Sequence, residues 1–117
     1  MSQRTERVAD QIRSEMSILL QREVRDPRVQ LASVTRVEVS RDLGHARIWI
    51  SVLGDEEQRL AAMEGIEHAR GFLRGQLARR LKLRITPELR FELDRGAEHL
   101  REITDLLEKL HQDEGDS

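Results

Sequence analysis

The stretch EHARGFLRGQLARRLKLR, Glu67–Arg84, has the pattern of a basic amphipathic helix that contains two helix-weakening residues. Its leucines recur every fourth residue, as an amphipathic helix requires: Leu73, Leu77 and Leu81. Gly71 and Gly75 interrupt this pattern, and a glycine in a helix interior costs about 1 kcal/mol relative to alanine. The stretch therefore predicts a helix that is broken near its start, at Gly71.

The length of the helical region explains why a break is needed here. A straight helix from Glu56 to Lys82 would span about 40 Å at 1.5 Å per residue, longer than a small sheet can cover. A break lets both halves pack on one sheet face and exposes the free N–H groups of the second helix, a natural site for a phosphate. We expect Gly71 to have a positive φ or a close backbone neighbour; the alternative is an ordinary helical glycine.

The segments before this region predict a helix and a β-hairpin. Residues Ser2–Val24 form a helix with one apolar stripe, made by Val8, Ile12, Met16, Leu19 and Leu20. Asp26-Pro27 ends it, because the residue before a proline disfavours the α conformation. Two alternating segments around the turn Asp42-Leu43-Gly44 then predict a hairpin, whose inward residues are Thr35, Val37 and Val39 followed by Ala46, Ile48, Ile50 and Val52.

The hairpin also predicts contacts on its outer face. If Ser40 pairs with His45, Arg36 lies opposite Trp49 as a cation–π pair. In the same register Glu38 lies opposite Arg47 as an ion pair. Trp49 could also be a base-stacking platform, but the structural pair with Arg36 is the favoured interpretation.

The segments after the basic helix predict a strand and a last helix. Thr86-Pro87 marks a break, and LRFELD, Leu89–Asp94, forms a third strand with Leu89, Phe91 and Leu93 facing inward. A helix from about Ala97 to Leu110 follows, and we expect it to bury Leu100, Ile103, Leu107 and Leu110. Residues 1–111 then make one domain, and residues 112–117 an acidic disordered tail.

These elements predict an α+β fold in the order α-β-β-α-kink-α-β-α. The strand–helix–helix–strand unit returns the third strand parallel to the second by a right-handed crossover. The result is a three-stranded mixed sheet in the order 1-2-3, with helices on one face and the other face open. This is the order of a type II KH domain, which binds nucleotides at a G-x-x-G loop between its two central helices.

The charge distribution favours a polyanionic partner. The net charge is −2, but residues 70–91 contain seven bases and one acid, while residues 92–117 contain nine acids and three bases. Lysine occurs only at Lys82 and Lys109, so arginine supplies 18 of the 20 basic residues. The arginine fork suits bidentate phosphate contacts. With three aromatic residues in the chain, we expect recognition through the RNA backbone and not through base stacking.

The sequence offers little for catalysis, metal binding or membrane insertion. There is no cysteine, and the four histidines have no metal-ligand spacing. No nucleophile elbow, P-loop or zinc motif occurs. No apolar run approaches the roughly 20 residues that cross a bilayer, and the first residues lack an apolar signal segment. We therefore expect a cytoplasmic monomeric binding protein without cofactor, small-molecule substrate or membrane contact.

Six segments, in order, resemble the bacterial ribosome-binding factor A family from Arg4 to about Leu107. They are RVADQIRSE (7–15), DPRV (26–29), VEVSRDL (37–43), SVLG (51–54), ARGFLR (69–74) and TPELRFELD (86–94). In this family an Ala-x-Gly kink replaces the KH loop, and Ala69-Arg70-Gly71 matches it. The resemblance implies an assembly factor that binds the immature small ribosomal subunit, supports 5′-end maturation of 16S ribosomal RNA and leaves before translation. It also implies a link to cold adaptation.

Two groups of residues fit that role as RNA-binding residues, one with six basic side chains and Gly71, the other with four arginines. The first is Arg70, Gly71, Arg74, Arg79, Arg80, Lys82 and Arg84, and the second is Arg4, Arg7, Arg22 and Arg25 on the first helix. The acidic terminal stretch would repel RNA, so we place it toward solvent or a protein partner. A protein–protein adaptor that uses the open sheet face or last helix remains an alternative, and a small hydrolase with dispersed acids is a weaker one.

Overall fold

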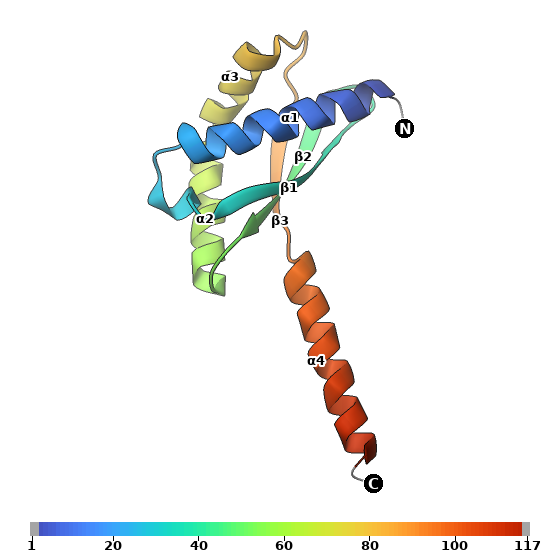
Figure 1. Cartoon of the computed structure of the whole chain (residues 1–117). Helices are drawn as coiled ribbons and strands as arrows, with labels where there is room; N and C mark the ends of the chain where they lie inside the picture. Colours follow the sequence, from blue (N-terminus) through green and yellow to red (C-terminus); the bar gives the residue numbers. More distant parts are fainter. Residues whose placement is uncertain (1–2, 116–117) are drawn as a thin grey trace.

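The computed structural model describes residues 3–115, with the side chains of residues 97–102 and 112–115 left aside. Its elements are α1 (Gln3–Arg22), the short 3₁₀ helix η1 (Pro27–Val29), β1 (Ala32–Val39), β2 (His45–Val52), α2 (Glu56–His68), α3 (Arg70–Leu81), β3 (Glu88–Leu93) and α4 (Gly96–Gly115). Figure 1 shows α1 lying across the sheet and α4 extending away from it. The α+β class and the element order predicted from the sequence are confirmed.

The sheet has the predicted topology. Its order is β1-β2-β3, with β1 antiparallel and β3 parallel to β2. Strand β2 is central because it pairs with both β1 and β3, and its alternate residues Ala46, Ile48, Ile50 and Val52 are all buried. These side chains form one core with the apolar stripe of α1 and with buried residues of α2, α3 and β3. Helices α1, α2 and α3 therefore cover one face of the sheet.

Strand β1 departs from the predicted alternation at Thr35. Val34 pairs with Ile50 and Arg36 with Trp49, so Thr35 is the extra residue of a β-bulge. The prediction that Thr35 faces inward is wrong, because the bulge turns its side chain outward. There its hydroxyl donates to the Asp94 carboxylate over 2.6 Å.

The break between α2 and α3 lies at Ala69, where φ is −89° and ψ is 1°. This confirms a kink at the predicted sequence, but the reason given for Gly71 is wrong. Gly71 lies inside α3 without a positive φ, and a Cβ added there would meet nothing within 4 Å. The kink is a property of the Ala69 backbone.

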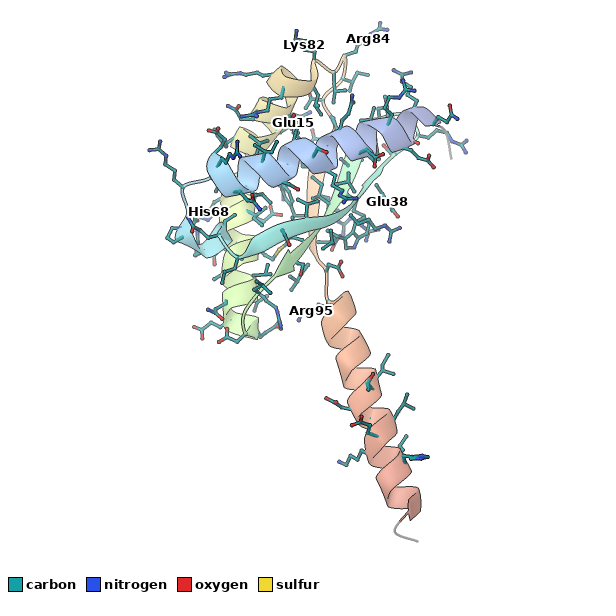
Figure 2. The ribbon with its side chains drawn as sticks, in the orientation of Figure 1. Glu15, Glu38, His68, Lys82, Arg84 and Arg95 are labelled. Carbon is teal, nitrogen blue, oxygen red and sulfur yellow. The ribbon has the colours of Figure 1, made fainter. Side chains whose placement is uncertain are left out.

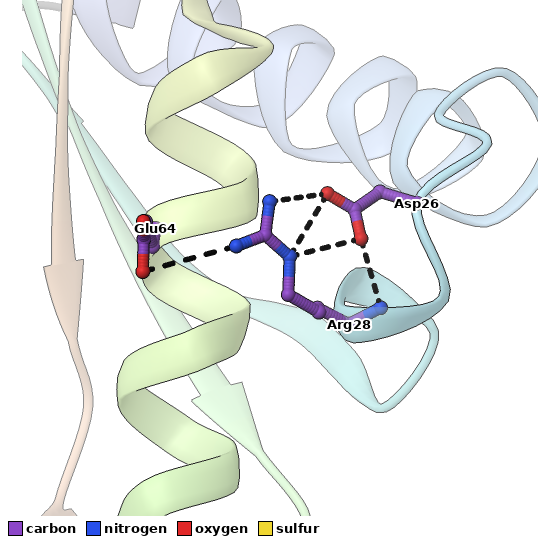
Figure 3. A network of polar contacts seen from close by, with 3 residues as sticks. All are labelled: Asp26, Arg28 and Glu64. Atoms are coloured by element: carbon purple, nitrogen blue, oxygen red, sulfur yellow. Dashed lines mark hydrogen bonds and ion pairs between the residues drawn. The ribbon is translucent and has the colours of Figure 1, made fainter.

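A close approach does occur at Gly65 in α2. A Cβ there would lie 2.9 Å from Val29 Cγ2 and 2.9 Å from Asp26 Oδ2. Figure 3 shows the neighbouring contacts, in which Arg28 Nη2 lies 2.8 Å from Asp26 Oδ2 and Arg28 Nη1 lies 3.8 Å from Glu64. Gly65 thus lets α2 pack directly against η1.

Helix α4 packs differently from the prediction. Ile103, Leu107 and Leu110, expected to be buried, are 40%, 61% and 58% exposed, and the Leu100 side chain lies outside the described residues. The helix also continues to Gly115, so it includes the first part of the predicted tail, while residues 116 and 117 lie outside the description. The predicted helix start at Ser2 is outside it as well.

Candidate nucleic-acid interface

Arg74, predicted to contact phosphate, is held by the loop that precedes β3. Its Nε donates to the carbonyl oxygen of Pro87 over 3.0 Å, and its Nη2 donates to that of Thr86 over 2.8 Å. The Glu88 carboxylate lies 3.4 Å from the same Nη2 nitrogen. Three acceptors therefore use the donors of Arg74, whose geometry is that of a residue that fixes this loop on α3.

Arg80 and Arg70 are also engaged inside the protein. Arg80 lies 3.3 Å from Glu15 and 3.5 Å from Glu23, so it joins α3 to α1. Arg70 forms an ion pair with Glu67 across the kink. These guanidinium groups are partly neutralised, which lowers their attraction for an anion.

Three basic residues at the end of α3 have free charges. Arg79, Lys82 and Arg84 are exposed and have no ion-pair partner in the part of the chain that the structure describes. Figure 2 shows Lys82 and Arg84 at one end of the molecule, where α3 ends. Lys82 has a φ of 49°, and this left-handed residue terminates the helix.

The four arginines predicted on α1 do not form one patch. Arg4 and Arg22 stand near opposite ends of the helix, about 27 Å apart at 1.5 Å per residue. Arg7 accompanies the first and Arg25 follows the second, beyond the end of α1. All four are exposed and lack an ion-pair partner among the described residues.

The structure adds Arg41, which the sequence singles out only as part of the segment VEVSRDL (37–43). Arg41 is exposed, and it shares a surface pocket with Arg4 and Arg84. The pocket thus joins one member of each predicted basic group. No signal along the chain indicates this, because the three residues come from separate segments.

The outer sheet face is occupied by internal pairs. The Arg36 and Arg47 guanidinium carbons lie 4.8 and 5.0 Å from the centre of the Trp49 ring, confirming the predicted cation–π contact. The predicted Glu38–Arg47 ion pair is wrong, since Glu38 pairs with Arg36 and Arg47 lies 3.4 Å from Glu92. Two guanidinium groups of the protein therefore pack on the Trp49 ring, in agreement with the structural interpretation of this residue.

Two carboxylates have lowered pKa values that local hydrogen bonds explain. The Asp94 pKa is lowered by hydrogen bonds from the Thr35 hydroxyl and the Gly96 N–H, and the Glu56 pKa by the Arg95 guanidinium. Within the described part of the chain, no group of histidines and carboxylates could hold a metal ion. None of the helices described there has the length and apolar character needed to cross a membrane.

Comparisons with known proteins match this arrangement to one family. The family model of ribosome-binding factor A matches residues 4–107. A ribosome-binding factor A of Prochlorococcus marinus (strain MIT 9303) is 51% identical over 111 residues, covering 93% of this chain and 78% of the relative. One from Caldanaerobacter subterraneus is 37% identical over 117 residues, covering 99% and 96%.

Solved structures agree with the sequence relatives. The crystal structure of ribosome-binding factor A from Thermus thermophilus has a TM-score of 0.70 and 26% identity, covering 79% of this chain and 97% of that one. A Thermus thermophilus homology model, fitted into the cryo-electron microscopy map of a complex of the 30S subunit with that factor, has a TM-score of 0.56 and 28% identity. It covers 72% of this chain and 92% of that one.

Proposed function

Since the chain belongs to the ribosome-binding factor A family, we propose that it binds the small ribosomal subunit during assembly. The likeness to the factor fitted into the map of a 30S complex carries this proposal. Binding supports late maturation and 5′-end processing of 16S ribosomal RNA, and the protein leaves before translation. It acts in the cytoplasm as a monomer, without catalysis of its own, and supports growth in the cold.

The basic side chains that have no ion-pair partner among the described residues support a contact with the RNA backbone. Exposed arginines attract phosphates when no carboxylate neutralises them. This condition is met by Arg79, Lys82, Arg84, Arg4, Arg7, Arg22 and Arg25. We assign the first contacts to these residues, and give Arg70, Arg74 and Arg80 the role of holding α3 in place.

Sedimentation tests this function directly. The protein is mixed with free small subunits, large subunits or complete ribosomes and centrifuged through a sucrose gradient. We expect it to travel with free small subunits and to be absent from complete ribosomes. Equal distribution over all particles, or recovery only at the top of the gradient, would contradict the proposal.

A protein contact through α4 is the second candidate function. Its exposed apolar side chains, Ile103, Leu106, Leu107 and Leu110, favour such a contact. Binding that does not change with salt concentration would support this adaptor role over RNA contact.

A further inference from the structure

A pocket of about 450 Å³ opens where three distant segments of the chain meet. The start of α1 supplies Arg4 and Val8, the β1–β2 turn supplies Arg41 to Leu43, and the α3–β3 connection supplies Leu83 to Ile85. Its volume lies in the range of small-ligand sites, about 300–1,000 Å³. Closing the fold is what creates it.

The charges of the pocket favour an anion. Three of its side chains are arginines without an ion-pair partner among the described residues: Arg4, Arg41 and Arg84. Its single carboxylate, Asp42, accepts hydrogen bonds from the Ser40 hydroxyl over 2.7 Å and from the Gly44 N–H over 2.9 Å. These bonds lower the Asp42 pKa, and they direct its charge toward the turn. The pocket therefore contains three arginines without an ion-pair partner among the described residues, and one carboxylate that is already hydrogen-bonded to its own turn.

The turn that carries Arg41 is held in place before any ligand binds. The Ser40 hydroxyl accepts from the His45 N–H over 2.9 Å, and the Leu43 N–H donates to the Ser40 carbonyl over 2.9 Å. Leu43 has a φ of 61°, which is rare for a branched residue and persists where neighbouring contacts fix it. A preorganised turn loses little freedom on binding.

The remaining lining is apolar. Val8, Leu43 and Leu83 belong to the core or pack against it, so they form a fixed floor. Ile85 is 57% exposed at the same pocket. An apolar floor beside several guanidinium groups fits a ligand with one flat apolar part and one phosphate.

From these observations we infer that the pocket binds one unpaired nucleotide of an RNA strand. The base lies against the apolar floor, and its phosphate is held by Arg41 and Arg84, with Arg4 alongside. Duplex RNA keeps its bases stacked and cannot fill the floor. Splayed bases stack on guanidinium planes, and extruded bases are held between aromatic or apolar side chains. The inference rests on the proposed function and adds the kind of RNA that this site takes.

Fluorescence anisotropy with a short labelled single-stranded RNA of mixed sequence tests the inference over a range of salt concentrations. Arg41→Ala and Arg84→Ala should each weaken binding about tenfold and lower the log–log salt slope by about 0.7. Ile85→Ser should weaken binding without changing the slope, because it removes an apolar contact only. Arg13→Ala, an exposed arginine elsewhere on α1, should leave both quantities unchanged.

Competition identifies the ligand. Unlabelled single-stranded RNA should displace the probe far better than a perfect RNA duplex, free adenosine monophosphate or a polyglutamate peptide. Equal displacement by any of these three would overturn the inference. So would unchanged affinity and slope in both arginine variants, even if the wild-type protein travels with small subunits. Failure of the wild-type protein to bind small subunits would instead contradict the proposed function.

Discussion

Two glycines in neighbouring helices have opposite roles, although both lie inside helical sequence. Gly71 has open space around it, while Gly65 has a side chain and a carboxylate within 2.9 Å of the missing Cβ. The Asp26 carboxylate is held by Arg28, and Val29 is buried, so neither can easily move away. Sequence alone could not separate the two, because the distinction depends on which helix η1 approaches.

Alanine at Gly65 should therefore destabilise the protein. We expect Gly65→Ala to lower the free energy of unfolding by about 1–3 kcal/mol, as overpacked core positions do. Urea denaturation measures this change. An unchanged or increased midpoint would show that η1 can move away from α2 at little cost.

Alanine at Gly71 should have the opposite effect. We expect Gly71→Ala to raise the free energy of unfolding by about 0.5–1 kcal/mol, since an exposed helical glycine without a positive φ gains helix propensity on substitution. Gly75→Ala is the matched variant, because it also meets nothing within 4 Å, and should behave alike in the same urea series. A lower free energy of unfolding for Gly71→Ala would contradict this prediction and support the hypothesis that the kink needs glycine at this position.

Asp26 predicts a pH dependence of stability. Hydrogen bonds from the Arg28 side chain and backbone lower the Asp26 pKa below its ordinary value of 3.8. The folded pKa is thus below the unfolded one, so the contribution is complete above about pH 4 and is lost as pH falls through the folded value. Urea midpoints of wild type and Asp26→Asn should differ near neutral pH and converge in acid. Asp10→Asn, an exposed substitution on α1, is the control near neutral pH, where its urea midpoint should stay close to that of wild type.

At the scale of elements, apolar periodicity predicted the helices and strands but not every partner. The apolar stripe of α1 and the inward residues of β2 are buried as expected, because α1 packs on the sheet face to which those β2 residues point. The period in α4 is equally clear, but α1, α2 and α3 already cover that face. In β1, the bulge at Thr35 shifts the alternation by one residue. The pairing with β2 reveals the bulge, and the outward Thr35 contacts Asp94 in a distant segment.

We expect the outer part of α4 to be dispensable for folding, because its described side chains are exposed. Deleting residues 103–117 should change the free energy of unfolding by less than about 0.5 kcal/mol, the range of surface changes, because Ile103, Leu106, Leu107 and Leu110 are exposed. Thermal and urea denaturation of the shortened chain measure this. A loss above about 1 kcal/mol would mean that α4 packs on the rest of the protein in solution.

At the scale of the whole molecule, positive charge and the projecting helix lie apart. Figure 2 shows Lys82 and Arg84 at the end of the protein opposite α4. The sequence showed this division as a basic stretch followed by an acidic one. It could not show which basic side chains lack an ion pair. Arg79 and Arg80 are adjacent in sequence, but among the described residues only Arg80 has acidic partners, Glu15 on α1 and Glu23 just after it. Nor could it join Arg41 to Arg4 and Arg84, whose common pocket exists only in the folded chain.

Some basic side chains form ion pairs within the protein and others do not. This difference gives the last prediction, on the salt dependence of small-subunit binding. Arg79→Ala and Lys82→Ala should each weaken binding and lower the log–log salt slope by about 0.7–0.9, the value expected for one lost phosphate contact. Arg80→Ala should leave the slope nearly unchanged and instead lower the urea midpoint, because it removes the link between α3 and the carboxylates of Glu15 and Glu23. Subunit pelleting at several potassium chloride concentrations gives both affinity and slope. The opposite outcome is that Arg80→Ala reduces the slope as much as Arg79→Ala does. The Arg80 ion pairs would then have to break when the protein binds the subunit, and the presence or absence of an ion pair would not predict which arginines contact RNA.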